Sequence, residues 1–431
     1  MLFDPEFPIN RFTPSTRASQ TCAILIFLLP AITLTTKISV GLVEVALLLT
    51  AIWYARPLWR QRAMLAGNER LIVSAFLFNL IIAAASLLQT GLDWRFLENP
   101  LKMVLATTAI GLIVLLRPPD RTFWFGLFVG TVGAMLFAIY QRFGLSMLRA
   151  EGFSMPITFG DIAMSMGLMS LAGIQQFSKT RWQALPYVAF AAGVVASILS
   201  GSRGGWLALL LSAVPVYSYG RHAMGRRAVV IIGMCVVLLA AVCVIPQVGV
   251  RDRLTDVAKE LHQYKNGNPD SSVGARLEMW KGALTLFSEH PVAGIGRANY
   301  NRGLNMLVDE GRIDPTMREY YHAHNEFLNA LATQGLLGGL ALFFLYAAPL
   351  YFFTRQLREP GMHRPYALAG VLLVLSFIDF GLTQVMFAHH IGSAFYAVNV
   401  CALAGLCLSA RYDGQRADDL RPDVCRPGLA N

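Results

Sequence analysis

The sequence predicts an all-α polytopic integral membrane protein with about twelve transmembrane helices and one large loop outside the membrane. Of its 431 residues, 55% are hydrophobic and only 14% are charged, a composition far from that of an average soluble domain. Apolar runs long enough to cross a bilayer recur along the chain, and Lys and Arg are divided unequally between alternate loops. These features are typical of a multi-pass membrane protein.

Candidate transmembrane helices follow from apolar runs of about 17 to 25 residues, the length that crosses about 30 Å of hydrocarbon. The short turns at 36–39 and 389–390 leave two breaks open, because either flanking pair could form one long helix. We therefore expect about twelve spans, with an uncertainty of about two. The approximate spans are 20–36, 38–55, 70–90, 102–116, 122–141, 159–177, 184–200, 205–220, 228–245, 325–353, 366–387 and 390–410.

The orientation follows from the basic residues, because Lys and Arg are retained on the cytoplasmic side of short loops. With the N-terminus inside, 20 basic residues fall in cytoplasmic segments and 6 in the short outer loops. The remaining ten lie in one long outer loop, 246–323, where ten acidic residues balance them. We therefore expect both termini in the cytoplasm. The net charge of +10 is then mostly a consequence of topology and requires no nucleic-acid partner.

This topology divides the chain into four parts. The long loop has no cysteine, so no disulfide framework is expected in it. Its segment 277–287 places Leu and aromatic residues at helical spacing, which predicts an amphipathic helix on the membrane surface. The parts are transmembrane helices one to nine (1–245), a large loop with amphipathic helices (246–323), helices ten to twelve (324–410) and a cytoplasmic tail (411–431).

Two arginines on the predicted outer side are candidate anion ligands. Arg203 lies in the glycine-rich turn "LSGSRGGW", and Arg276 falls in the first turn of the amphipathic segment. Taken alone, Arg203 could be a snorkelling residue of a tight turn, and Arg276 an ordinary exposed charge. However, the spans beginning near Gly205 and Asn325 both start at the outer face, so their positive dipole ends point to the same side. Because Arg binds phosphate oxygens in a bidentate manner, we expect a lipid-linked phosphate or diphosphate there.

The stretch "YYHAHNEFLNALATQGLLGG" supplies a candidate base. His324 precedes Asn325, a predicted N-cap, where the helix dipole tends to keep an imidazole neutral and able to accept a proton. A loop histidine can also be merely solvated, and this alternative is stronger for His322. The two histidines have no third ligand at recognisable spacing, and the chain has no Asp-x-Asp pair for a diphosphate-bound cation. We therefore expect no metal and no other cofactor, with the arginines replacing a cation.

Three ordered segments, "SGSRGGW", "GARLEMWKGALTLFSEHPVAGIG" and "HAHNEFLNALATQGLLGG", resemble the hallmark segments of the O-antigen ligase and polymerase superfamily. The segment "RAEGFSMPITFG" is a weaker fourth match. Within the superfamily, the chain length and short polar tail are most similar to the O-antigen ligases, because protein O-oligosaccharyltransferases usually carry a longer C-terminal region. The resemblance implies a glycosyltransferase-C-like fold with a periplasmic loop.

The resemblance also implies an activity. It is the transfer of O-antigen polysaccharide from undecaprenyl diphosphate to a sugar hydroxyl of lipid A-core, at the periplasmic face of a Gram-negative inner membrane. Family residues match Arg203, Arg276 and His324, with His324 as the base of an inverting displacement and the arginines holding the diphosphate. Asp379, in "SFIDFGLTQVMF", resembles an acidic family position, although a helix-packing hydrogen bond explains it equally well.

Three other functions stay open. An O-antigen polymerase or a protein O-oligosaccharyltransferase of the same superfamily would use a similar donor with another acceptor. A transporter or flippase of lipid-linked sugars would use the same charged residues to line a path. Against transport, the sequence has no internal repeat and no charge pairs along the spans, and its notable groups gather on one face.

Overall fold

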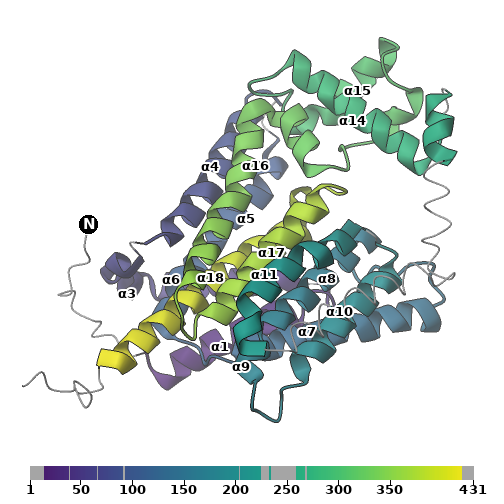
Figure 1. The fold of residues 1–431 in the computed structure, drawn as a ribbon. Coiled ribbons are helices and arrows are strands. Elements are labelled where there is room, and N and C mark those ends of the chain that lie inside the picture. The colour runs from purple at the N-terminus through teal and green to yellow at the C-terminus, as the bar shows by residue number, and fades with distance from the viewer. Residues whose placement is uncertain are drawn as a thin grey trace, which may run out of the picture.

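The chain folds as a helical bundle with a smaller helical unit at one end (Figure 1). This computed structural model describes residues 14–37, 39–65, 67–90, 93–202, 204–224, 233, 259–266 and 269–419, and every regular element in them is a helix. Arg203, the predicted span 228–245 and most of the tail lie outside the described residues. The all-helical fold class is therefore confirmed for the described part, while the count of twelve spans stays a prediction.

The first half of the chain supplies eleven α-helices in the described part, of which α6 and α8 are almost completely buried. A left-handed Arg117 ends α6, and a π-helical turn at Tyr140–Gly144 extends α7. The helices are α1 (Thr16–Ala31), α2 (Ser39–Trp53), α3 (Ala55–Arg60), α4 (Glu69–Leu87), α5 (Glu98–Ala106), α6 (Thr108–Leu116) and α7 (Thr122–Ile139). They are followed by α8 (Pro156–Ala172), α9 (Ile174–Phe177), α10 (Leu185–Ser200) and α11 (Leu207–Met224).

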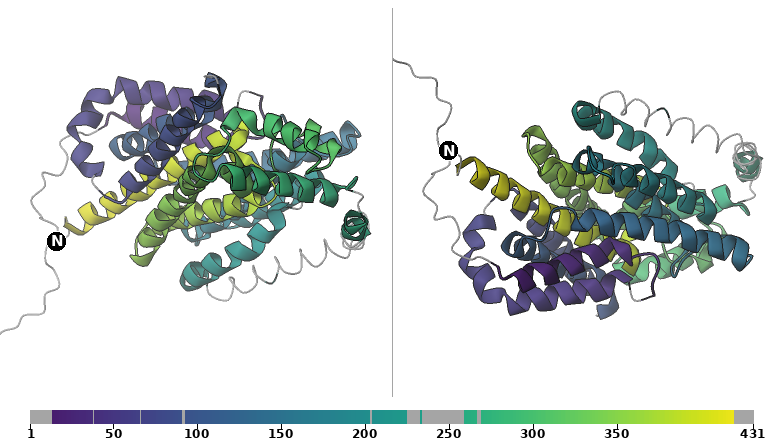
Figure 2. Two further views of the ribbon diagram at one scale, coloured as in Figure 1. Left: turned by 90° about the horizontal axis from the view of Figure 1, so that it is seen from above. Right: turned by 90° about the horizontal axis from the view of Figure 1, so that it is seen from below.

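The last two helices form the centre of the bundle. The C-terminal helices are α16 (Glu326–Arg358), which is half exposed, and the central α17 (Arg364–Gly381) and α18 (His390–Asp419). Both views of Figure 2 show the yellow α18 running between the purple N-terminal helices and the green and teal helices. This position explains why 94% of its most apolar window is buried. Such a helix is apolar on all sides because protein surrounds it.

Six helices in the described part are long and apolar enough to cross a membrane. They are found at 69–87, 94–116, 122–144, 326–358, 364–381 and 390–414. Five shorter apolar helices accompany them, among them α8 and α10. The protein is therefore a helical membrane protein by length and composition. Both breaks that the sequence left open separate two helices, since α1 and α2 are distinct, as are α17 and α18.

The long loop contains a compact unit with a core of its own. It is built on α14 (Ser272–Glu289) and α15 (Tyr300–Asp309), which lie at the top of the bundle in Figure 1. One face of α14, including Met279 and Leu286, packs against α15 and not against a membrane. The face that the sequence predicts to lie on the membrane surface is next to this one on α14 and carries Leu277, Trp280, Leu284 and Phe287. On it, Leu284 is 50% exposed. Its contact with the membrane surface stays a prediction.

The unit is fixed to α16 by a crossing of two glycine-bearing segments. Gly335 interrupts α16 with φ 62° and ψ −153°, a conformation that strongly favours glycine. The freed backbone pairs with segment 291–296: the N–H of Gly296 donates to the carbonyl of Thr333 at 2.8 Å, and that of Leu336 to the carbonyl of Pro291 at 2.8 Å. A Cβ on Gly294 would lie 2.3 Å from the Thr333 backbone. Both glycines are therefore required by this close approach.

Several predicted boundaries differ from the observed ones, and three of these differences bear on the site or the core. The predicted span 102–116 is divided at Thr107 into α5 and α6. The predicted span 366–387 ends at Gly381, and residues 382–389 form a turn. The last predicted span continues beyond residue 410, because α18 extends to Asp419. Apolar composition alone could not find these ends, since the turn 382–389 is itself mostly apolar and half of its residues are buried.

The orientation is tested by single cysteines in a cysteine-free background. We expect positions near 60, 180, 225, 360 and 420 to be cytoplasmic and 246–323 to be periplasmic, because of the distribution of Lys and Arg. A membrane-impermeant maleimide should label Ser288→Cys in intact spheroplasts and Arg60→Cys only after permeabilisation. Both side chains belong to exposed residues, so accessibility does not bias the result. The reverse labelling pattern would place the loop unit in the cytoplasm and contradict the assignment.

Candidate functional site

A pocket of about 400 Å³ lies between the first turn of α14 and the segment that leads into α16. Ser271 caps α14 and accepts a hydrogen bond from the N–H of Gly274 at 3.0 Å, which fixes one wall of this pocket. The pocket brings Arg276 and His324 together, two of the residues predicted from the sequence. We call it the arginine pocket; its lining is Pro269, Asp270, Ser271, Ser272, Ala275, Arg276, Met279, Thr316, Tyr320 and His324.

Arg276 is the cation among the described residues that line this pocket. Its guanidinium is half-buried and has no hydrogen-bond or ion-pair partner among the described residues. Burial lowers the pKa of Arg276, although an arginine still keeps its charge at any relevant pH. A partly buried charge without a partner is costly. Its position is therefore typical of a group that meets an anionic ligand.

His324 occupies a strained backbone position at the edge of the arginine pocket. Its φ is +46°, in the left-handed region that a histidine seldom adopts. Burial, and next the nearby charge of Arg276, lower the pKa of His324, while a hydrogen bond with the Gln384 side chain acts in the opposite direction. Nδ1 has no hydrogen-bond partner among the described residues. The imidazole thus favours the neutral form at pH 7, with one buried nitrogen that has no partner in the described part.

His324 belongs to a cluster of three histidines. The ring centroids of His322 and His324 are 4.3 Å apart, and those of His322 and His389 are 6.0 Å apart. Burial and the neighbouring rings lower the pKa of His322 and of His389 to about 4 each. All three rings are therefore uncharged at neutral pH. No group of three or more metal-ligating side chains in the described part is arranged to hold a metal ion.

Sequence reasoning missed His389 as a site residue. It considered the pair at 389–390 only as a possible turn between two spans. A signal was present, because the predicted topology places that turn on the same face as His322 and His324. The sequence could not reveal the distance, since His389 and His322 are 67 positions apart and meet only through tertiary packing.

The start of α16 holds the turn that carries His389. Asn325 caps α16, as the sequence predicts: its Oδ1 accepts from the N–H of Leu328 at 3.0 Å, and its Nδ2 donates to the Leu382 carbonyl at 3.2 Å. Glu326 is buried, and its Oε2 accepts from the N–H of Phe387 at 2.9 Å. Asn325 and Glu326 therefore hold the two ends of the turn 382–389 next to the segment that carries His322 and His324.

Two buried carboxylates hold the turn that contains Arg203. The Ser202 hydroxyl donates to Asp161 Oδ1 at 2.7 Å, and the N–H of Ala208 donates to Asp379 Oδ2 at 2.8 Å. Arg203 itself lies outside the described residues. Its neighbour Gly204 lies so close to Thr383 that an added Cβ would be 2.4 Å from the Thr383 hydroxyl oxygen. The turn around Arg203 thus packs against the turn that also carries Gln384 and His389.

Asp379 has a packing role in this arrangement. Its side chain is 2% exposed and binds the first turn of α11, so the hydrogen-bonding alternative that the sequence left open fits its contacts. It does not line the arginine pocket. Asp161, which sequence reasoning did not consider, has the equivalent role on the other side of the Arg203 turn. A single acidic residue in an apolar span was the signal that could have found it.

Together these features define a helical membrane protein with a polar site between its bundle and its loop unit. Residues 188–344 match a family model described as O-antigen ligase. An "O-antigen ligase" of Escherichia coli strain K12 is 27% identical over 155 residues, 36% of this chain and 35% of that protein. An "Uncharacterized protein" of Haemophilus influenzae is 24% identical over 349 residues, 80% of this chain and 87% of that protein. These matches confirm the resemblance to the O-antigen ligase superfamily.

The protonation state of the site is tested by NMR of the protein labelled with ¹³C at histidine Cε1. The His324 resonance, assigned from its loss in His324→Gln, should titrate with a midpoint below the ordinary 6.5, because burial and Arg276 disfavour the cation. Those of His322 and His389 should have midpoints of about 4. Arg276→Gln should raise the His324 midpoint, because a nearby positive charge is removed. A His324 midpoint at or above 6.5 would show that the imidazole is solvated and would remove the basis for a neutral site.

Proposed function

We propose that this protein is an O-antigen ligase. It transfers O-antigen polysaccharide from undecaprenyl diphosphate to a sugar hydroxyl of lipid A-core, at the periplasmic face of a Gram-negative inner membrane. One observation carries this proposal: an unpartnered Arg276 and a neutral His324 line the same pocket, inside the segment that matches the O-antigen ligase family. An anion-binding group and a proton acceptor are the two functions that this transfer requires.

His324 acts as the general base in the proposed reaction. The acceptor hydroxyl attacks the anomeric carbon of the donor, its proton passes to Nδ1 of His324, and the bond from that carbon to the diphosphate oxygen breaks. The electron pair leaves with undecaprenyl diphosphate, and the configuration at the anomeric carbon inverts. Because the pKa of His324 is lowered, the imidazole is already neutral before the acceptor binds. The positive φ of this residue is compatible with a functional constraint on its position.

Arg276 and Arg203 hold the diphosphate. Charge accumulates on the leaving group as the glycosidic bond breaks, and guanidinium groups stabilise it most strongly in a partly buried site. Arg276 lacks a protein partner in the described part, so it is available for this role. For Arg203 the support is indirect, because its flanks are fixed by Asp161 and Asp379 against the turn that carries Gln384. We propose that the two cations replace a divalent metal ion and that no cofactor is needed.

The test mixes the purified protein in detergent with lipid-linked O-antigen and rough lipopolysaccharide, in the presence of EDTA. We expect a ladder of glycosylated lipopolysaccharide on a gel. Longer lipid-linked chains without lipopolysaccharide products would identify a polymerase, and glycosylated protein an O-oligosaccharyltransferase. Movement of the donor across proteoliposomes without any transfer would identify a flippase. Loss of transfer in EDTA that Mg²⁺ or Mn²⁺ restores would contradict the role given to the arginines.

Substitutions in the same assay separate the base from the anion ligands. His324→Ala should lower turnover about 10² to 10⁴-fold, the usual contribution of a positioned base, and leave donor binding near normal. Arg276→Ala and Arg203→Ala should also weaken donor binding by about 10 to 100-fold, because each loses hydrogen bonds to a charged group. Arg276→Lys should retain only part of the donor binding, because an ammonium group keeps the charge but lacks the planar pair of N–H donors of a guanidinium. His322→Ala should have a milder effect.

His290→Ala is the matched control, because this histidine belongs to the same loop unit, is exposed and lies outside the arginine pocket. It should transfer at the wild-type rate. Initial rates are measured beside direct binding of the lipid diphosphate, and thermal stability is recorded for every variant. Normal transfer by His324→Ala would refute its role as the base. Normal transfer by both His324→Ala and His322→Ala would remove the whole cluster from the mechanism.

A further inference from the structure

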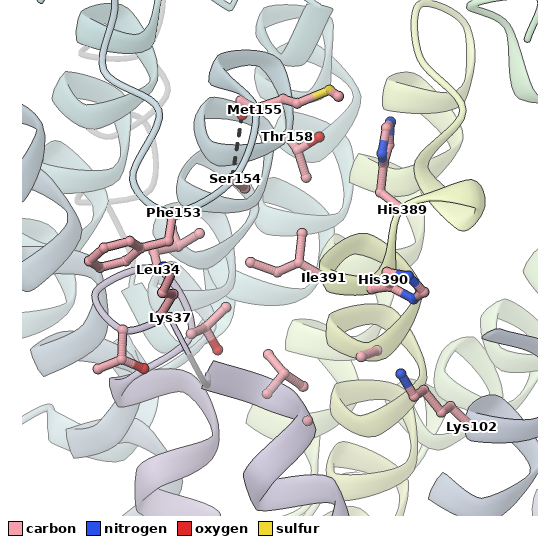
Figure 3. A pocket seen from close by; sticks show the side chains of 15 residues that line it. Leu34, Lys37, Lys102, Phe153, Ser154, Met155, Thr158, His389, His390 and Ile391 are labelled. Carbon is pink, nitrogen blue, oxygen red and sulfur yellow. Dashed lines mark hydrogen bonds between the residues drawn. The ribbon is translucent and has the colours of Figure 1, made fainter. Parts of the chain in front are cut away.

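A second pocket, of about 460 Å³, lies on the other side of the histidine cluster. Four segments form it: the turn between α1 and α2, the first half of α5, residues 153–158 and the start of α18 (Figure 3). In the predicted topology all four reach the same outer face. His389 lines this pocket, whereas His324 lines the arginine pocket. His322 stands between them, 4.3 Å from the ring of His324 and 6.0 Å from that of His389.

Cationic side chains gather in this second pocket, which we call the lysine pocket. Lys37 is exposed and has no ion-pair partner among the described residues. Lys102 lies in α5 and pairs with Glu98 at 2.6 Å. His390 Nδ1 lies 2.8 Å from Asn99 Oδ1 and 3.7 Å from the same Glu98 carboxylate. Among the described residues, the ammonium group of Lys37 is therefore unpaired, and that of Lys102 is paired with the Glu98 carboxylate. Glu44 of α2 also lies near Lys102.

Two buried polar atoms in the lysine pocket lack partners. Thr158 is 1% exposed, and its hydroxyl has no hydrogen-bond partner in the described part of the chain. The Nε2 atom of His389 is equally buried and unpaired. Figure 3 shows both side chains on the wall of the pocket. Because a buried polar group without a partner costs about 1 to 3 kcal/mol, such atoms point to a polar ligand or to ordered water.

The rim of the lysine pocket carries exposed apolar side chains. Phe153 and Met155 are 53% and 56% exposed, and both line the pocket. Next to it, α2 presents Leu42, Val45 and Leu49 to the surroundings with more than half of each side chain exposed. This combination of a free lysine, a second lysine paired with one carboxylate and an apolar border suits an amphiphile whose anionic headgroup enters the pocket while its acyl chains stay in the bilayer.

We propose that the lysine pocket binds the phosphate groups of a phosphorylated glycolipid, the acceptor, and thereby presents its sugar hydroxyl to the histidine cluster from the side opposite the donor. This inference rests on the proposed ligase function. The donor diphosphate is assigned to the arginine pocket, because planar guanidinium groups match paired phosphate oxygens. Lysines act as mobile point charges and suit phosphate monoesters whose positions vary on a large headgroup.

The test measures the KM for each substrate in Lys37→Gln and Lys102→Gln. We expect the acceptor KM to rise about tenfold in each variant, with the donor KM and kcat unchanged, because a hydrogen bond to a charged group is lost. An acceptor freed of its phosphates by phosphatase should bind about as weakly to wild type as the intact acceptor binds to the variants. Glu98→Gln should lower the acceptor KM, because Lys102 loses its competing carboxylate.

Lys281→Gln is the control. Lys281 is another lysine on the predicted outer side; it pairs with Glu278 at 3.6 Å and does not line the lysine pocket. This variant should leave both KM values unchanged. Unchanged acceptor KM in both lysine variants would overturn the proposal, even if the wild type ligates normally. A rise in the donor KM instead would assign the pocket to the donor and would equally overturn it.

A binding measurement distinguishes failure of this proposal from failure of the ligase function. Native mass spectrometry of His324→Ala with intact or dephosphorylated lipid A-core records binding without turnover. Binding that depends on Lys37 and on the phosphates would support the pocket even if no transfer were found, and only the ligase function would then fall. Transfer by the wild type with lysine-independent binding would reject the pocket alone.

Discussion

The candidate site depends above all on one buried carboxylate, that of Glu326. It lies at the first position of α16, is 6% exposed and accepts from the N–H of Phe387 at 2.9 Å. Without it, a buried backbone donor would lose its partner at a cost of about 1 to 3 kcal/mol, and the turn 382–389 would keep only its other attachment, from Asn325 to the Leu382 carbonyl. That turn carries Gln384 and His389, so this contact helps to position His389 beside His322.

Glu326 also connects the bundle to the loop unit. It lines the same small cavity as Arg297, whose Nε donates to Gln334 Oε1 at 2.9 Å and whose backbone N–H donates to the Ser86 hydroxyl at 3.0 Å. This contact lies beside the glycine crossing that fixes the loop unit to α16. The network therefore determines where α14 lies above the bundle, and hence that Arg276 reaches the neighbourhood of His324. The arginine pocket is in this sense built by contacts between segments that are distant in the sequence.

Much of the fold was predictable, because lipid imposes simple constraints on composition. Most predicted spans coincide with helices in the described part, and Asn325 is the N-cap that its sequence context predicts. Motifs and topology placed Arg276 and His324 on one face, and the shared pocket came from the structure. The division at Thr107, the kink at Gly335 and the position of His389 were not predictable in the same way. Each depends on a tertiary contact that local apolarity and spacing do not encode.

The central claim is that donor and acceptor approach the histidine cluster from two sides. It is tested most directly by a cryo-electron microscopy structure of His324→Ala with the undecaprenyl diphosphate-linked donor bound. The account predicts that the diphosphate lies within hydrogen-bond distance of Arg276, with the first sugar directed toward position 324 and the lysine pocket free of donor. Diphosphate beside Lys37 and Lys102, or a sugar directed away from position 324, would contradict it.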